Sequence, residues 1–135
     1  MIFNKKKRYF KNMLDGVQKM IWDREFKREK ALMIREEVRK EYEKNKAKLE
    51  IIQSQIKTQK EKPTMEEGDI KRLDDQEVLL KRDIERYEAQ MKQMDLDVNG
   101  SKETNEHPEG YTGINQELDS LRELQEITKV YIKTL

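Results

Sequence analysis

The strongest constraint on the fold is a regular alternation of three- and four-residue steps in the second half of the chain. The positions that follow it are Ile70, Leu73, Glu77, Leu80, Ile84, Tyr87, Met91, Met94 and Val98. Glu77 is the only polar member. Apolar residues at this spacing form one narrow stripe along an α-helix, and such a stripe is typical of helices that pair as coiled coils. We therefore expect a helix over residues 64–98 whose seam packs against another helix.

A matching seam lies upstream, at Val38, Tyr42, Asn45, Leu49, Ile52 and Ile56. We predict one long helix over residues 4–62, capped at its start by Asn4 and ended by Pro63, since proline pushes the residue before it out of the helical region. Thr64 and Glu67 form a capping-box pattern that would start the next helix. The short turn between the two seams predicts an antiparallel hairpin.

A polar loop over residues 99–113 precedes a third predicted helix at 114–135, capped by Thr112 or Asn115. Its apolar residues are Ile114, Leu118, Leu121, Leu124, Ile127, Tyr131 and Leu135. Two layouts fit the lengths. In one, the third helix packs on the earlier half of the first helix. In the other, it folds back beside the hairpin as a three-helix bundle.

Composition supports helices over disorder. Charged residues make up 42% of the chain and hydrophobic residues 34%, which is too polar for a compact globule. A disordered chain would show no apolar period and a large net charge, whereas the net charge here is +1. We predict an all-α fold: a long antiparallel helical hairpin, coiled-coil-like, with a third shorter C-terminal helix, forming a single elongated domain over residues 1–135.

The charges divide between the two halves of the chain. Residues 1–62 carry 19 Lys and Arg against 10 Asp and Glu, whereas residues 63–135 carry 10 against 18. The halves therefore differ in sign, at +9 and −8. Antiparallel packing would set a basic arm against an acidic one, which selects register more than it adds stability.

Several functional classes receive no support from the residues present. The chain has no cysteine, and its one histidine, His107, lies in the polar loop without a second histidine nearby. We find no phosphate-binding glycine loop or nucleophile elbow, so we predict no catalytic residue and no enzyme activity. No apolar run has the length of a signal peptide or a membrane span. We expect a soluble cytoplasmic protein or a virion component.

The most specific motif begins at Asp95 and reads Asp-Leu-Asp-Val-Asn-Gly-Ser-Lys-Glu-Thr-Asn-Glu. It resembles an EF-hand calcium loop. The resemblance implies calcium ligands at Asp95, Asp97, Asn99, Ser101 (through its carbonyl), Glu103 and Glu106. The alternative is an Asn-Gly helix stop followed by a polar linker that binds no ion, which Pro108 directly after the motif favours.

The basic N-terminal segment is a second candidate site. Residues 1–30 carry ten Lys and Arg against four Asp and Glu. The candidate interaction residues are Lys5, Lys6, Lys7, Arg8, Tyr9, Phe10 and Trp22. Basic residues with aromatics on a helix bind nucleic-acid phosphates or an anionic membrane surface. Alternatively, the aromatic residues face the third helix and the lysines are solvated.

These patterns predict a non-enzymatic structural or assembly protein that docks on other protein subunits, its own copies or different chains, through coiled-coil-like helices. The lysine-rich, cysteine-free composition resembles that of small virion and phage structural proteins. A nucleic-acid-binding accessory protein and a calcium-binding module are the alternatives.

Overall fold

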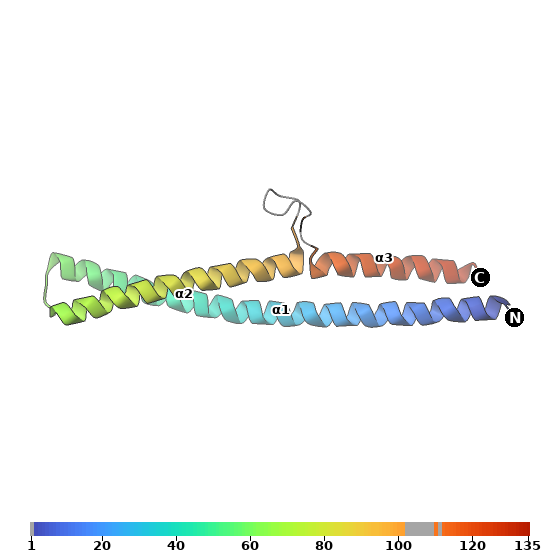
Figure 1. The fold of residues 1–135 in the computed structure, drawn as a ribbon, viewed down its shortest axis with the longest axis horizontal. Coiled ribbons are helices and arrows are strands. Elements are labelled where there is room, and N and C mark those ends of the chain that lie inside the picture. Colours follow the sequence, from blue (N-terminus) through green and yellow to red (C-terminus); the bar gives the residue numbers. More distant parts are fainter. Residues whose placement is uncertain (1, 102–109, 111) are drawn as a thin grey trace. The chain divides into compact units, whose positions relative to one another are not determined.

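A computed structural model describes residues 2–101, 110 and 112–135, with side chains from Lys5 onward. These residues form three α-helices and contain no strand: α1 (Ile2–Glu61), α2 (Glu67–Asn99) and α3 (Ile114–Lys133) (Figure 1). The predicted all-α hairpin with a shorter third helix is confirmed.

The start of α2 differs from the prediction. Thr64 does not cap this helix, because its N–H and its side chain are bonded to Gln59 in the last turn of α1, with 2.9 Å between Thr64 N and Gln59 Oε1. Met65 N–H donates to the same oxygen at 3.0 Å. The helix begins at Glu67, and the Glu66 carbonyl accepts hydrogen bonds from Asp69 N–H and Ile70 N–H, each at 3.1 Å. The capping-box prediction was wrong because a glutamine side chain of α1 competes for Thr64. The predicted cap Asn4 lies inside α1, which begins at Ile2.

Two glycines control the passage from α2 to α3. Gly100 has φ 68° and donates its N–H to the Leu96 carbonyl at 2.8 Å, a left-handed glycine termination of α2. Gly113 is the N-cap of α3 and offers no side-chain bond, so the prediction of a cap by Thr112 or Asn115 was wrong. Gly113 is buried so tightly that a Cβ there would lie 2.2 Å from Gly100 N.

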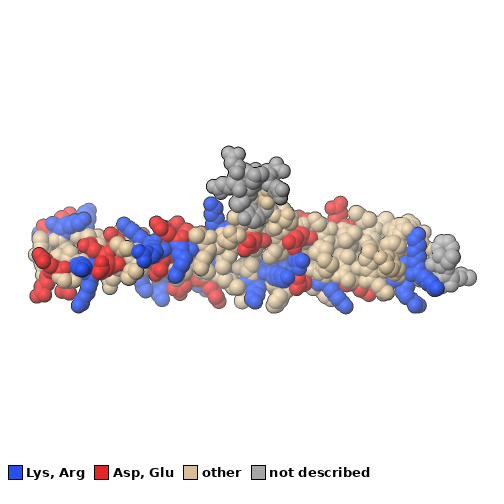
Figure 2. Space-filling view, in the orientation of Figure 1, with Lys and Arg blue, Asp and Glu red and all other residues tan. Residues whose placement is uncertain are grey.

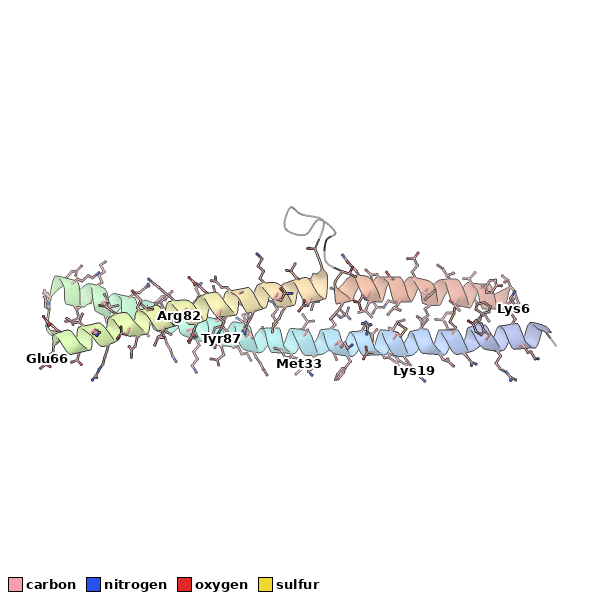
Figure 3. The ribbon with its side chains drawn as sticks, viewed as in Figure 1. Lys6, Lys19, Met33, Glu66, Arg82 and Tyr87 are labelled. Atoms are coloured by element: carbon pink, nitrogen blue, oxygen red, sulfur yellow. The ribbon has the colours of Figure 1, made fainter. Side chains whose placement is uncertain are left out.

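The chain divides into two compact units. The hairpin unit, Ile34–Gln93, joins the later half of α1 to most of α2. Ile56 and Ile84 are buried in it, and so is the polar seam residue Asn45. The Tyr42 hydroxyl bonds Glu88 across the hairpin at 2.9 Å. Of the other predicted seam residues of α2, Val98 is buried, and these are half-buried: Ile70, Leu73, Glu77, Leu80, Tyr87, Met91 and Met94. Figure 3 labels Tyr87 on this helix.

The terminal unit consists of Met1–Met33 and Met94–Leu135. Its core is Val17, Ile21 and Leu118, with Ile114 and Leu121 packed against them. Figure 1 shows α3 beside the N-terminal part of α1. The third helix therefore takes the first of the two layouts and packs on the earlier half of α1. The prediction of a single elongated domain over residues 1–135 stays a prediction.

Candidate interaction surfaces

The α1–α3 pair is antiparallel, and one of its two lateral sides is closed by polar contacts. The Gln125 side-chain amide donates to Gln18 Oε1 at 2.5 Å. Arg122 donates to Glu25 Oε1 at 3.1 Å. Further along, Arg28 donates to Asn115 Oδ1 at 3.1 Å. On this side, hydrogen bonds between side chains cover the junction of the helices. In the Arg122–Glu25 pair the base lies on α3 and the acid on α1, the reverse of the predicted pairing of a basic first helix with an acidic partner.

The other lateral side is apolar and open. We call it the lateral patch, and it consists of five residues that remain substantially exposed: Tyr9, Met20, Leu124, Ile127 and Tyr131. Two contacts show that these residues share one side of the pair. Arg24 Nε donates to Glu117 Oε2. Arg24 lies one turn after Met20 and Glu117 lies two turns before Leu124, so each shares a side of its helix with that apolar residue. The Lys6 ammonium, three residues before Tyr9, lies 5.7 Å from the centre of the Tyr131 ring.

The Phe10 ring anchors one end of the α1–α3 pair. It packs edge-on against Tyr131, with 4.9 Å between ring centres, and Tyr9 packs edge-on against Phe10 at 5.3 Å. Edge-to-face pairs of this kind add about 1 kcal/mol beyond the area that they bury. The Phe10–Tyr131 contact therefore joins the C-terminal part of α3 to the N-terminal part of α1.

A second apolar surface lies on the face of α1 turned away from α3. We call it the outer face, and it comprises Trp22, Phe26 and Met33, which are 61%, 66% and 68% exposed. Steps of four and seven residues place them on one stripe of the helix. Figure 3 labels Met33 on the side of α1 away from α3. A shallow depression of about 270 Å³ lies between Trp22 and Phe26 and is bordered by Glu25, Arg28 and Glu29.

Charge at the Glu117 end of the lateral patch is locally balanced. Arg24 bonds both Glu117 and Asp23, at 2.5 Å each, and the hydrogen bond with Glu117 raises the pKa of Arg24. A hydrogen bond with Lys27 lowers the pKa of Asp23. In the hairpin unit, a hydrogen bond with Arg39 lowers the pKa of Glu36 in the same way. Arg24 and Glu117 are half-buried, whereas Asp23, Lys27, Glu36 and Arg39 are exposed, so the ion pairs of these four orient side chains more than they stabilise the fold.

The structure divides the predicted basic interaction segment. Lys5, Lys6, Lys7 and Arg8 are all exposed, and the Lys6 ammonium also lies 5.7 Å from the centre of the Tyr131 ring. Phe10 is half-buried against α3, as the structural alternative expected, but Trp22 is not. Sequence reasoning treated Leu124 and Ile127 as seam residues, counted Phe26 in a broad apolar stripe of the first helix, and did not name Met33. The sequence signal for these exposed surfaces is that the apolar stripes on α3 and on the earlier half of α1 are wider than one partner helix can cover.

The calcium prediction falls partly outside the described residues, where Glu103 and Glu106 lie. Asp95, Asp97 and Asn99 belong to the last turns of α2, and residues two apart on a helix do not face each other. Asn99 Oδ1 accepts a bond from Asn115 at 3.0 Å. Calcium binding by these three residues would require the end of α2 to unwind. Ser101, the fourth predicted ligand in this part of the chain, has a buried hydroxyl oxygen that makes no hydrogen bond within the part described.

No group of three or more His, Cys, Asp or Glu side chains is arranged to hold a metal ion among the residues that the structure describes. Over the same residues, no helix has the combination of length and apolar content that a bilayer crossing requires. Comparison with known proteins found no family model, no curated protein and no solved structure that matches the chain.

Proposed function

We propose that this chain is a non-enzymatic structural or assembly protein that docks on other protein subunits through its helices. One observation carries the proposal: after α1 and α3 have paired, large apolar side chains remain exposed on two separate surfaces of the terminal unit, the lateral patch and the outer face. An apolar patch of several hundred Å² is among the largest that soluble proteins expose and is often an interaction site. From the lysine-rich, cysteine-free composition, we place this role in the cytoplasm or in a virion.

The chemistry of the outer face favours a protein partner. Trp22, Phe26 and Met33 follow the spacing with which a helix inserts side chains into the groove of another protein. Glu25 and Glu29 border the depression between the aromatic rings. Arg28 lines the depression as well, and a mixed acidic and basic border of this kind suits the polar rim of a protein groove. Trp and large aromatic residues are also the side chains that dominate binding energy at protein interfaces.

Site-specific photo-crosslinking tests the proposal in the native setting. A photoreactive residue in place of Phe26 should give an adduct with one protein species, and unlabelled chain should compete it away. The same residue in place of Lys44, which is exposed in the hairpin unit, serves as the control. Trp22→Glu should abolish the Phe26 adduct. Adducts with lipid or nucleic acid only, or protein adducts that unlabelled chain does not reduce, would refute docking through this face.

A nucleic-acid-binding accessory role is the second candidate, and a specific observation favours it. Lys5, Lys7, Arg8 and Lys11 are exposed on neighbouring turns at the start of α1 and make no ion pair within the described part of the chain. Clustered cations of this kind bind phosphates by releasing counterions, which makes affinity fall with salt. Titration of DNA and RNA at low and physiological salt, with the charge-reversed variant Lys7→Glu/Arg8→Glu, tests it. Binding that ignores both salt and the substitutions would exclude this role.

A further inference from the structure

We propose that the lateral patch is the contact surface for a second copy of this chain, so that two terminal units pack together as a four-helix arrangement. This inference rests on the proposed docking function and names the partner for one of its two surfaces. It concerns only contacts that the terminal unit makes with another terminal unit. The outer face stays available for a different protein.

The two lateral sides of the α1–α3 pair differ in a way that indicates which one is covered. On one side, Gln18–Gln125 and Glu25–Arg122 bonds close the junction between the helices. On the other side, Tyr9 and Ile127 are 66% and 59% exposed. A pair of helices that faced only water would gain nothing from apolar residues at these positions. Figure 2 shows a broad uncharged area over the parts of α1 and α3 near the chain ends.

The pattern of α3 points the same way. Residues Ile114, Leu118 and Leu121 face the α1 core, while Leu124, Ile127 and Tyr131 continue a second stripe with steps of three and four residues. A helix with two adjacent seams contacts two partners, as helices in four-helix bundles do. Within the described residues, α1 covers the first seam, whereas along the second stripe Tyr131 meets Phe10 of α1 at one end and Ile127 stays 59% exposed.

The area of the lateral patch suits a dimer. A fully exposed side chain of this size presents roughly 200 Å², so the exposed fractions of the five residues sum to roughly 500 Å² of surface. A standard interface buries about 800 Å² on each partner, of which the core is apolar and the rim polar. The Arg24–Glu117 pair and Lys6 lie at opposite ends of the patch and supply such a rim.

A second copy is the occupant that this geometry fits best. In a two-fold contact the same surface meets itself, so its length and polarity match without a separately evolved partner. An antiparallel two-fold arrangement also places the Lys6 end of one patch beside the Glu117 end of the other. A parallel arrangement would instead bring the two cationic Lys6 ends together, whereas the antiparallel one sets each Lys6 beside the balanced Arg24–Glu117 end.

Sedimentation velocity over a wide concentration range tests the inference on the full chain. The wild-type protein should change from 16.4 kDa toward twice that mass as concentration rises. Ile127→Glu should raise the dissociation constant at least about 100-fold, because the substitution occurs twice in a two-fold interface and each copy costs about a factor of ten. The matched control is Ile51→Glu in the hairpin unit. Ile51 is 60% exposed, nearly the same as Ile127, so both variants should fold equally well.

Three results decide the matter. A dimer that Ile127→Glu weakens and Ile51→Glu leaves intact supports the inference. A wild-type chain that stays at 16.4 kDa at every concentration overturns it. A dimer that withstands Ile127→Glu also overturns it, since another surface must then hold the copies together. Neither negative result touches the proposed docking function, which the Phe26 crosslink tests independently.

Discussion

Gly113→Ala should destabilise the terminal unit through one added methyl group. The new Cβ would lie 2.2 Å from Gly100 N and 2.6 Å from both Asn99 C and Val98 O. Carbon atoms at such distances overlap strongly, and all three neighbours are backbone atoms that cannot rotate away. The backbone of Gly113 itself, at φ −92° and ψ 168°, suits alanine well. The cost is therefore purely one of space, and the start of α3 must move by about 1 Å to relieve the overlap.

The movement of the start of α3 determines how much stability Gly113→Ala loses. Leu118, which is fully buried, lies five residues into the same helix and packs with Val17 and Ile21. Overpacking of this kind costs about 3 kcal/mol, and the reduced flexibility of the unfolded alanine chain offsets about 0.5 kcal/mol. We expect a net loss of about 2.5 kcal/mol in the free energy of unfolding. Gly16→Ala is the matched control, because a Cβ there meets nothing within 4 Å in the middle of α1. It should stabilise the helix by about 1 kcal/mol.

Urea unfolding followed by far-UV circular dichroism gives the free energies, at one low protein concentration for all three proteins. Amide hydrogen exchange locates the change: α3 should exchange faster in Gly113→Ala, while residues 40–60 keep their protection. Opposite signs for the same chemical substitution are the essential result. A Gly113→Ala protein as stable as the wild type would refute the close backbone contact between the end of α2 and the start of α3.

Four further outcomes follow from the described contacts. Leu118→Ala should cost about 3 kcal/mol in urea unfolding, since its side chain is fully buried, and a cost below about 1 kcal/mol would contradict this core. Asn45→Leu should raise the stability of the hairpin unit, because a polar seam residue selects register at the expense of stability; a lower urea midpoint would contradict it. The hydrogen bond with Lys27 lowers the pKa of Asp23 below 3.8, so its contribution is complete above that pH and is lost as pH falls through the folded-state pKa. When the pH falls below about 4, the urea midpoint should therefore decrease slightly in the wild type and less in Asp23→Asn. An equal decrease in both proteins would show that Asp23 does not cause the pH dependence. Calorimetry with calcium should show heat that Asp95→Ala abolishes if the loop is a calcium site, and equal heats would exclude it.

Local sequence rules predicted the elements well because helix periodicity needs no tertiary information. The alternation from Ile70 to Val98 requires a helix with one apolar stripe, and α2 spans it. Asn99-Gly100 ends that helix through a left-handed glycine, which the dipeptide predicts from its own conformational preferences. Pro63 likewise separates α1 from α2.

Contacts between distant residues account for what the sequence did not predict. Thr64 has the right side chain for a cap, but Gln59 in the preceding helix takes its hydrogen bonds. Gly113 serves as the cap of α3 because only a residue without Cβ fits against Gly100. Periodicity likewise places Leu124 and Ile127 on an apolar stripe without saying how much of that stripe α1 covers. The interaction surfaces therefore became visible only when the helices were paired.

Both proposed surfaces depend on one claim: α3 pairs antiparallel with the N-terminal half of α1 in its own chain. The chain has no native cysteine, so pairs of introduced cysteines can be joined by a short bis-maleimide reagent without side reactions. Gln18→Cys/Gln125→Cys should crosslink within single chains, since these side chains are in contact. Gln18→Cys/Asn115→Cys should not, because Asn115 bonds Arg28, about 15 Å further along α1. Efficient crosslinking of the second pair, or of the first pair only between different chains, would contradict the pairing and both surfaces with it.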